Sequence, residues 1–340
     1  MPNRNLKIAL VGAGAIGGVT GARMTRSGWE VQIVSNRPEA VALAQNPGFH
    51  LFGIGGEAHI PVRALKTVAE LDGPLDVAFL ATKAAEAPAA AESLLPLLKP
   101  DAALVSLQNG ICEEALAEVA GAERVVGCVV GWGATFHGPG RMEVTSEGEF
   151  VVGRLDGTTD SRLEAVRDML ASAAPTRVST NIMGELYSKL IVNSCINSLG
   201  VIAGAPLGQL LAARKIREIF IAIMAEAVAV ADAMALTVPP GGGGKLDYRS
   251  FLAQTGWLGS LRRHLMIRLI GFKYRRIRSS SLQSLDRGRK TEVDFLNGYI
   301  CRQGRRHEVP TPINDAVVEM IHEIEAGERP ISMANLAVLG

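Results

Sequence analysis

The sequence predicts a two-domain protein, in which an α/β domain with helices covering a parallel sheet is followed by an all-helical domain. Its 340 residues exceed the roughly 250–300 at which a single hydrophobic core stops growing. The first half alternates short β-branched runs with Ala- and Leu-rich stretches, as strands and helices do in a parallel sheet. Strand patterns nearly vanish after about residue 180. We therefore expect domains over residues 1–180 and 181–340.

The strands and helices expected in the first half alternate along the chain. Strands are expected at Leu6–Val11, Glu30–Ser35, Leu75–Thr82, Ala102–Leu107 and Val125–Val130, with helices between them at Ile16–Ser27, Arg37–Ala44, Ala84–Leu98 and Glu113–Ala120. The segment Arg141–Leu155 predicts an antiparallel hairpin that finishes the sheet. A helix at Ser161–Ala173 and a strand at Thr176–Ser179 close the domain.

Helical periodicity dominates the second half. The expected helical segments are Met183–Leu199, Leu207–Met234, Tyr248–Ile270, Thr291–Arg302 and Pro312–Gly327, with a flexible turn at residues 239–244. The most apolar stretch, Ile219–Leu236, is interrupted by Glu226 and Asp232, which indicates a buried helix and not a membrane span.

Composition and charge exclude several classes of protein. Hydrophobic residues make up 48% of the chain and charged residues 20%, as in globular proteins with a core. Lys and Arg number 35 against 34 for Asp and Glu, so the net charge of +1 supplies no global field for nucleic acid or an anionic membrane. Residues Met1 to Leu6 contain Arg4 and lead directly into a strand pattern, so we expect no secretion signal. We expect a cytoplasmic protein with neither nucleic acid nor membrane as a partner.

Metal and hydrolase chemistry is poorly supported by the motifs. The cysteines form no C-x-x-C pair, which favours free thiols in a reducing compartment over disulfides or zinc; they are Cys112, Cys128, Cys195 and Cys301. The histidines form no H-E-x-x-H pair, and no G-x-S-x-G elbow is present. We expect no bound metal.

The first strand ends in a G-x-G-x-x-G turn formed by Gly12, Gly14 and Gly17. The first glycine permits the tight turn, the second lets the backbone approach a pyrophosphate, and the third lets the helix pack on the strand. The phosphates then meet a helix N-terminus, whose N–H groups and dipole favour negative charge. Immediately after a strand, this motif predicts a Rossmann dinucleotide-binding domain; the alternative is a purely structural turn.

The end of the second strand favours NADP(H) over NAD. NAD sites usually place an acidic residue there to bind the ribose 2′-hydroxyl, whereas this chain has Ser35-Asn36-Arg37. Arg37 is suited to a 2′-phosphate, although it could also be the first solvated residue of the next helix. Lys83 and Asn109 follow two further strands, and we expect them at the same edge as cofactor contacts.

A polar stripe interrupts the apolar helix predicted from Met183. Lys189, Asn193 and Asn197 are spaced i, i+4 and i+8 and therefore share one face. Such a stripe lines a ligand cavity or finds buried partners; the alternative is a solvated face. A later cluster contains Ser280 and the Thr291–Gly298 motif, in which Glu292 and Asp294 cannot both face a site.

Together these motifs resemble the ketopantoate reductase family in their order along nearly the whole chain. The resemblance implies a Rossmann domain, a helical domain and reduction by NADPH of a small-molecule 2-oxo acid, 2-dehydropantoate, to pantoate in pantothenate biosynthesis. Separately, a homodimer is a possible assembly, with residues 181–340 as the substrate and dimerisation domain. The resemblance also implies residue roles: Lys189 as the proton donor, Asn193, Asn197 and Ser280 as substrate contacts, Asn109 as a contact of cofactor and substrate, and Glu292 on the cofactor side.

The chemistry of ketone reduction suits these residue types. Hydride delivery leaves negative charge on the carbonyl oxygen, and a positioned ammonium group stabilises that charge and donates a proton. Partial burial lowers the affinity of a lysine for its proton, which suits Lys189 to this task. Glu292, if close, would orient the ammonium group and keep it charged.

Two positions depart from the family pattern. Ketopantoate reductases usually carry two further substrate-binding asparagines, which fall on Leu207 and Ile277 here. The 2-oxo acid class is therefore better supported than ketopantoate itself. The basic stretch 262–278 is open to three interpretations: a solvated helix face, a lid for an acidic substrate, or a partner surface.

Two other functions remain as alternatives. A related two-domain dehydrogenase acting on a different 2-oxo acid or on a 3-hydroxy acid would usually rely on a catalytic histidine. A non-catalytic NADP sensor would keep the Rossmann domain but would not need Lys189 and Glu292.

Overall fold

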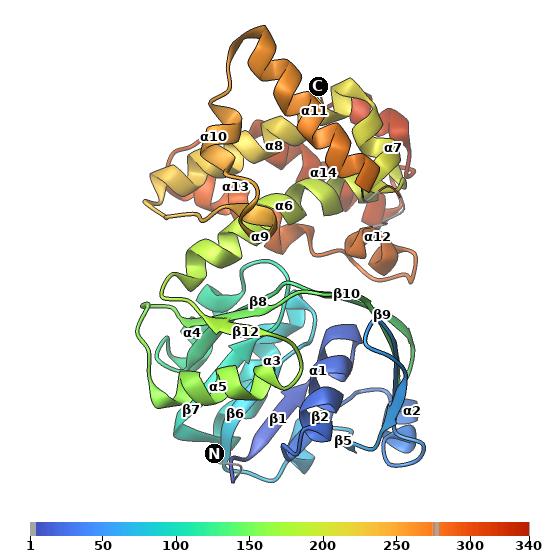
Figure 1. Ribbon diagram of the computed structural model, residues 1–340, viewed down its shortest axis with the longest axis vertical. Helices are drawn as coiled ribbons and strands as arrows, with labels where there is room; N and C mark the ends of the chain where they lie inside the picture. The colour runs from blue at the N-terminus through green and yellow to red at the C-terminus, as the bar shows by residue number, and fades with distance from the viewer. Residues whose placement is uncertain (1–4, 274, 276–278, 340) are drawn as a thin grey trace. The chain divides into compact units, whose positions relative to one another are not determined.

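The computed structural model describes residues 5–273, 275 and 279–339. The chain divides into two compact units, Met1–Leu186 and Tyr187–Gly340. Figure 1 shows strands and helices in the first unit and helices in the second. This division into an α/β unit and a helical unit confirms the predicted fold class.

The N-terminal unit is built on an eight-stranded sheet with the order β12-β11-β8-β7-β6-β1-β2-β5. All neighbouring strands are parallel except β8 and β11. The strands are β1 (Ile8–Val11), β2 (Val31–Val34), β5 (Arg63–Leu65), β6 (Leu75–Leu80), β7 (Leu98–Ser106), β8 (Val125–Val130), β11 (Phe150–Arg154) and β12 (Thr176–Val178). Central strands β1, β6 and β8 are buried along their whole length, as expected for a sheet covered on both faces.

Helices connect these strands and cover them (Figure 1). They are α1 (Ala15–Arg26), α2 (Pro38–Leu43), α3 (Ala87–Leu94), α4 (Glu113–Ala120) and α5 (Ser161–Ala171), with short 3-10 turns at Val68–Glu70, Ala84–Glu86 and Leu95–Leu97. The helix predicted at Ala84–Leu98 is thus only eight residues long, and the prolines Pro88 and Pro96 lie at the starts of α3 and of the last turn. Helices α1 and α5 share one core with Ile8 and Leu10 of β1.

The hairpin predicted at Arg141–Leu155 is wrong, because its two strands belong to different sheets. Strand β10 (Arg141–Ser146) lies in a second, four-stranded sheet of order β4-β3-β10-β9, with β3 (Phe49–Gly53), β4 (Ala58–Ile60) and β9 (Gly133–Gly138). Strand β11 pairs instead with β8. Met142 packs against α1, where its Cε lies 2.6 Å from the position that a Cβ on Gly18 would take. This contact draws β10 to the helix-covered face and away from β11.

The C-terminal unit is helical. Its helices are α6 (Ile182–Ala203), which begins just before the unit, α7 (Leu207–Ala212), α8 (Arg214–Ala233), α9 (Gly241–Gly244), α10 (Tyr248–Leu252), α11 (Gly256–Lys273), α12 (Ser280–Leu285), α13 (Asn297–Arg306) and α14 (Pro312–Ala326), with 3-10 turns at Val293–Phe295 and Met333–Ala337. Of the described residues, only α6 is long and apolar enough to match a membrane span, and 78% of that window is buried inside the protein.

Three predicted helical segments are interrupted. The segment Leu207–Met234 breaks at Ala213, because buried Arg217 donates hydrogen bonds to the carbonyls of Leu211 (2.8 Å) and Ala212 (2.7 Å) and so ends α7. The segment Tyr248–Ile270 breaks before Gly256, whose φ is +72°. The segment Thr291–Arg302 is a 3-10 turn followed by α13, and residues 241–244 of the predicted flexible turn form one helical turn.

A buried polar network joins four helices of this unit. The Asn297 side-chain amide donates to the carbonyl of Ser194 on α6 (3.2 Å) and to Oδ1 of Asn314 on α14 (2.9 Å). Asn314 in turn donates to Glu226 on α8 (2.6 Å). Glu226 also accepts the backbone N–H groups of Ile313 and Asn314, both at 2.9 Å, at the start of α14, where a carboxylate is favoured. This acid in the apolar stretch is therefore a helix cap.

Candidate functional site

The glycine turn between β1 and α1 has the geometry of a phosphate-binding loop. Gly12 donates to the carbonyl of Val34 (3.0 Å), and a Cβ there would lie 2.6 Å from the carbonyl carbon of Ala81 at a φ of +110°. A Cβ on Gly17 would lie 2.0 Å from the oxygen of Gly12. A Cβ on Gly14, in contrast, would meet no atom within 4 Å. Gly12 and Gly17 are thus required by packing, whereas Gly14 faces open space at the helix N-terminus.

Arg37 lies at the end of β2, beside an aromatic ring that the sequence did not indicate. Its guanidinium carbon is 4.7 Å from the centroid of Phe136, a cation–π contact. The Arg37 backbone N–H donates to Oγ of buried Ser35 (3.3 Å). Phe136 belongs to β9, a strand of the second sheet. The second sheet thus supplies the surface on which the arginine rests.

The ends of β6 and β7 carry a chain of polar side chains. Ser106 donates to Oε1 of Gln108 (2.8 Å), and the Gln108 amide donates to Oγ1 of Thr82 (3.5 Å). Lys83 and Asn109, the two predicted cofactor contacts, follow Thr82 and Gln108 and are both partly exposed. Because β7, β6, β1 and β2 are adjacent and parallel, Gly12, Gly14, Gly17, Arg37, Lys83 and Asn109 all lie at one edge of the sheet.

Glu113 lies beneath this edge and was not singled out from the sequence. It is the first residue of α4, is 1% exposed, and its Oε2 accepts the backbone N–H of Cys112 (2.9 Å). Burial raises the pKa of Glu113 to about 7, although hydrogen bonds from its own backbone, Ser106 and Cys112 act in the opposite direction. The side chain therefore titrates near neutral pH, close to the segment that carries Asn109.

In the C-terminal unit, α6 presents a narrow partly exposed stripe. From Tyr187 to Ala203 every residue is buried except Lys189, Val192, Asn193 and Ile196, which are partly exposed. Asn197, the third member of the predicted polar stripe, is 6% exposed. Lys189 and Asn193 thus share the accessible face of the helix with two apolar side chains, and Asn197 lies at its buried edge.

The serine segment before α12 packs against the same helix through Ser279. Ser279 is 5% exposed, caps α12 by accepting from Leu282 (3.2 Å), and donates to the carbonyl of Asn197 (3.4 Å). The predicted substrate contact, Ser280, is the first residue of α12 and is exposed. Ser279 thus fixes this segment against α6, whereas the side chain of Ser280 is exposed.

The two acids of the Thr291–Gly298 motif are separated as expected. Glu292 is 8% exposed, whereas Asp294 is exposed and lies 2.9 Å from Nε2 of His322. The motif also contains Asn297, whose side-chain amide donates a hydrogen bond to the carbonyl of Ser194 on α6. This contact places the segment that carries Glu292 alongside α6.

Of the two positions that depart from the family pattern, 207 and 277, only the first lies among the described residues. Leu207 is the first residue of α7 and is 4% exposed, so it is a core residue. Ile277 lies outside the described residues, as do Arg276 and Arg278 of the basic stretch. Within that stretch Arg262 and Arg268 are exposed on α11.

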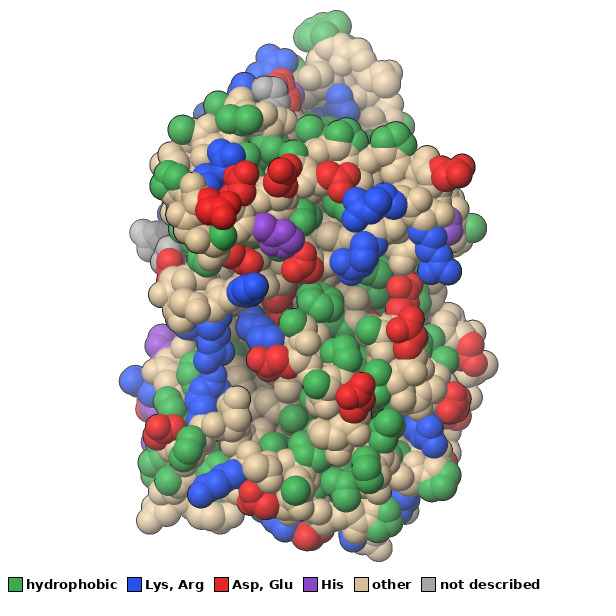
Figure 2. Space-filling view, turned by 180° about the vertical axis from the view of Figure 1, so that it is seen from behind, with side chains coloured by type: hydrophobic (Ala, Val, Ile, Leu, Met, Phe, Trp, Pro, Cys, Tyr) green, Lys and Arg blue, Asp and Glu red, His purple; other side chains and the backbone are tan. Residues whose placement is uncertain are grey.

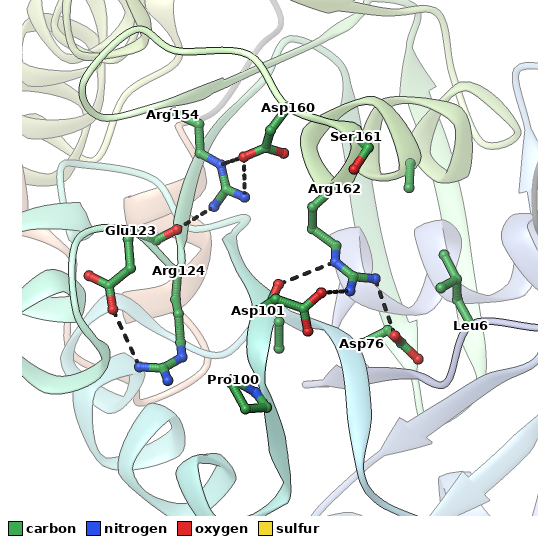
Figure 3. Close-up of a pocket in the computed structure, with 12 residues that line it drawn as sticks. Leu6, Asp76, Pro100, Asp101, Glu123, Arg124, Arg154, Asp160, Ser161 and Arg162 are labelled. Carbon is green, nitrogen blue, oxygen red and sulfur yellow. Dashed lines mark hydrogen bonds and ion pairs between the residues drawn. The ribbon is translucent and has the colours of Figure 1, made fainter.

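A cavity of about 620 Å³ lies at the opposite, amino edge of the main sheet (Figure 3). Its charged side chains pair with one another: Arg154 with Asp160 (2.8 Å), and Arg162 with Asp101 (2.5 Å) and Asp76 (3.2 Å). Burial alone would raise the pKa of Asp76, but hydrogen bonds from Lys99 and the Lys7 backbone, together with the charges of Lys99 and Arg162, lower it. Ligands of open parallel sheets bind at the other edge, and we therefore seek the functional site there.

Other kinds of site find little support in the described part of the chain. No three His, Cys, Asp or Glu side chains gather there as a metal would need, and all four cysteines are free and buried. His137 pairs with Glu143 across β9 and β10 at 2.7 Å. On the face shown in Figure 2, basic and acidic side chains are interspersed, and neither sign covers a broad area.

Comparisons with known proteins agree along the whole chain. The family models "Ketopantoate reductase PanE/ApbA" and "Ketopantoate reductase PanE/ApbA C terminal" match residues 8–157 and 181–325. A 2-dehydropantoate 2-reductase of Pyrococcus abyssi is 30% identical over 336 residues, covering 95% of this chain and 99% of that protein.

Solved structures give the same result. A PanE/ApbA family ketopantoate reductase from Ralstonia eutropha is 28% identical, with a TM-score of 0.81 and coverage of 95% of this chain and 99% of that one. A D-mandelate dehydrogenase with NADH and anilino(oxo)acetate, 24% identical with a TM-score of 0.78 over 95% of this chain and 99% of that chain, shares the fold. This chain belongs to the ketopantoate reductase family.

Proposed function

We propose that this protein is an NADPH-dependent reductase that converts a 2-oxo acid, 2-dehydropantoate first among the candidates, to the 2-hydroxy acid. Family membership over both halves of the chain supports oxidoreductase chemistry with a nicotinamide dinucleotide. The observation that carries the proposal is the stripe on α6, where Lys189 and Asn193 are the polar side chains accessible on an otherwise buried helix. A cytoplasmic location follows from this metabolic role.

The residues at the carboxyl edge of the sheet fit an NADP(H) molecule. The open space at Gly14 leaves room for the pyrophosphate at the start of α1, where no side chain caps the helix. Arg37, steadied by Phe136, is the group to bind the 2′-phosphate, since no carboxylate is present at positions 35–37 to repel it. Lys83 and Asn109 are assigned the ribose and nicotinamide ends. Bound there, the nicotinamide supplies the hydride.

The side chains of the C-terminal unit hold the substrate and move the proton. The Lys189 ammonium group hydrogen-bonds the ketone oxygen, stabilises the negative charge that develops on it and donates the proton. Asn193, Asn197 and Ser280 bind the carboxylate and hydroxyl groups without adding charge. Glu292 orients the ammonium group. Residues 1–180 thus serve the cofactor and residues 181–340 the substrate.

A panel of 2-oxo acids with NADPH, followed by loss of nicotinamide absorbance, tests this function. We expect turnover of 2-dehydropantoate, and Lys189→Met should lower kcat by about 100- to 10,000-fold while NADPH still binds. Near-normal kcat in that variant would remove Lys189 from the mechanism. NADPH binding without turnover of any 2-oxo acid would instead favour a sensor.

The breadth of substrate choice depends on position 207. The side chain of Leu207 has no donor or acceptor and is buried, so it offers no hydrogen bond to the hydroxyl of 2-dehydropantoate. We expect kcat/KM for 2-dehydropantoate and 2-oxoisovalerate to differ by no more than about ten-fold. A ratio above roughly a thousand would mean that other residues supply the missing contact and that the enzyme is dedicated to 2-dehydropantoate.

A further inference from the structure

Helix α11 exposes an unusually large apolar face. Of the eleven large hydrophobic side chains that are exposed among the described residues, seven belong to this one helix. They form the α11 face: Trp257 (76% exposed), Leu258 (57%), Leu261 (58%), Leu265 (55%), Met266 (38%), Leu269 (60%) and Phe272 (69%). In Figure 1, α11 lies beside α7 at the periphery of the helical unit.

The opposite side of α11 is the side that packs on its own unit. Ile267 is 2% exposed, and a Cβ on Gly271 would lie 2.7 Å from Cβ of Leu211 on α7. His264 lies 3.3 Å from the Nε of Arg217 on α8. The inward side thus carries Ile267, Gly271 and His264, while seven large apolar side chains are left exposed, which is unusual for a surface helix.

The size of the α11 face matches one side of a protein interface. If a fully exposed large apolar side chain presents about 200 Å², the seven exposed fractions correspond to roughly 800 Å². The largest apolar patch of a typical monomer is about 300–600 Å². A standard interface buries about 800 Å² on each partner.

Five of the seven side chains of the α11 face are spaced symmetrically about Leu265, and Trp257 and Met266 lie outside this pattern. Leu261 and Leu269 lie four residues to either side of it, and Leu258 and Phe272 lie seven residues to either side. These spacings keep all five on one helical stripe. In an antiparallel pair of α11 helices, Leu265 would meet its own copy, Leu261 would meet Leu269, and Leu258 would meet Phe272.

The charges on α11 are compatible with this pairing. Residues 256–273 contain no acid, and the exposed arginines Arg262 and Arg268 lie three residues before and after Leu265. On a helix, these two positions fall on opposite edges of the stripe. In the antiparallel pair the two copies of Arg262 lie on one rim and the two copies of Arg268 on the other, each pair about 9 Å apart along the helices and in solvent.

We propose that the α11 face is the contact of a twofold-symmetric homodimer, in which α11 packs antiparallel against α11 of a second copy. The contact is isologous, because the same stripe serves both partners. This proposal does not rest on the reaction that the protein catalyses.

Sedimentation velocity and light scattering of the full chain over a range of concentrations test the assembly. We expect a species of twice 36.0 kDa. Leu265→Glu places two carboxylates against each other on the twofold axis and should raise the dimer dissociation constant at least about 100-fold. Val338→Glu, at a site 73% exposed outside the face, is the matched control and should leave the dimer intact. Circular dichroism and Tm establish that both variants are folded.

Tryptophan fluorescence follows the same equilibrium without any substitution. Trp29 and Trp132 are 5% and 6% exposed, so dilution of the wild-type protein should shift only the emission of Trp257 to longer wavelength. An emission maximum independent of concentration, together with a monomer at every concentration, overturns the proposal.

Cysteine cross-linking tests the antiparallel register. The native cysteines are buried, so an introduced thiol reports alone. Leu265→Cys should form a disulfide-linked dimer on oxidation. Leu261→Cys should not do so by itself, because the two copies of residue 261 are about 12 Å apart along the helices, but it should link to Leu269→Cys when the two variants are mixed.

Three outcomes contradict the proposal. A dimer that persists in Leu265→Glu would place the contact elsewhere. Cross-linking of Leu261→Cys to itself, but not to Leu269→Cys, would exclude the antiparallel register. A monomer that co-sediments with vesicles of anionic phospholipid, and loses this binding in Leu265→Glu, would assign the face to a lipid surface.

Discussion

The two edges of the main sheet differ in how their polar groups are used. At the carboxyl edge, open space surrounds Gly14 at a helix N-terminus, and amide and hydroxyl side chains line the strand ends. At the amino edge, carboxylates and guanidinium groups pair with one another around a cavity of about 620 Å³. The charges around the amino-edge cavity are therefore already paired, whereas the carboxyl edge offers a helix N-terminus beside Gly14.

The difference follows from the topology of a parallel sheet. Strands β1, β2 and β7 lead at their carboxyl ends into α1, α2 and α4, so the positive ends of several helix dipoles meet at that edge. The amino edge receives the chain from helix C-termini and has no such field. Substitutions should accordingly change cofactor kinetics at one edge and folding stability at the other.

The largest effect is expected at the open position of the glycine loop. Gly14→Val adds a side chain where a Cβ meets nothing within 4 Å, so the fold should survive while the pyrophosphate loses its place. KM for NADPH should rise by at least roughly 100-fold, equivalent to about 2.7 kcal/mol. Gly17→Ala is the contrasting variant, since its Cβ would lie 2.0 Å from the Gly12 oxygen, and it should lower Tm. If Gly14→Val lowered Tm as much as Gly17→Ala does, the side of the loop at Gly14 would not be open.

At the amino edge, Asp76→Asn should cost stability and leave kcat/KM unchanged. The Asp76 side chain is 4% exposed and pairs with the partly exposed Lys99 (2.8 Å) and with Arg162, and losing a hydrogen bond to a charged group costs about 1.5–3 kcal/mol. Because the folded-state pKa of Asp76 is lowered from 3.8, this stability is present at neutral pH and is lost as pH falls below about 4.

Asp101→Asn supplies the control for that measurement. Asp101 pairs with the same Arg162 but its side chain is 73% exposed, so its loss should cost less than about 1 kcal/mol. Denaturant unfolding at pH 7 and pH 3 measures both variants. A fall in kcat/KM for Asp76→Asn at unchanged stability would make the amino edge part of the site.

Glu113 is an exception at the carboxyl edge, since it is a buried acid that affects stability. Its folded-state pKa is raised from 4.5 to about 7, so the native protein holds a proton that the unfolded chain releases. Stability should therefore fall as pH rises from about 5 to 8, by roughly 2–3 kcal/mol, and Glu113→Gln should abolish this contribution. The exposed neighbour provides the control: Glu114→Gln should keep the wild-type pH dependence.

The smallest effect concerns the arginine that rests on the second sheet. Arg37→Ala should raise KM for NADPH by about ten-fold and leave KM for NADH nearly unchanged. Phe136→Leu removes the ring but keeps an apolar residue, and it should reduce the preference for NADPH about three-fold. Loss of NADH and NADPH binding in equal measure would mean that Phe136 supports the fold and not the arginine.

The sequence predicted features that depend on local pattern and missed those that depend on distant partners. Strands β1, β2, β6 and β8 are buried apolar runs and lie where expected. Strands β3, β4, β5 and β9 are short or only partly buried, and their apolar content is too small to identify them. The break between α7 and α8 depends on Arg217, which could not be recognised as a cap before its burial was known.

The same distinction applies to the candidate site. The glycine spacing predicted the turn, because backbone approach demands glycine at particular positions. Phe136 and Glu113 belong to no recognisable motif. The pairing of β9 with β10 positions Phe136, and the packing of α4 positions Glu113, near the carboxyl edge of the sheet. The roles assigned to Lys189 and Glu292 stay predictions that kinetics must test.

The second sheet also sets the order in which the protein is completed during synthesis. Strand β3, at residues 49–53, pairs in parallel with β10, at residues 141–146, so nearly a hundred residues must be translated before this pair forms. Contacts so distant in sequence form late, because the loop between them must first be closed. The nascent chain therefore has its glycine turn long before Phe136 on β9 reaches Arg37. The selection of NADPH that we propose for Arg37 therefore becomes complete only after β9 has been translated and folded.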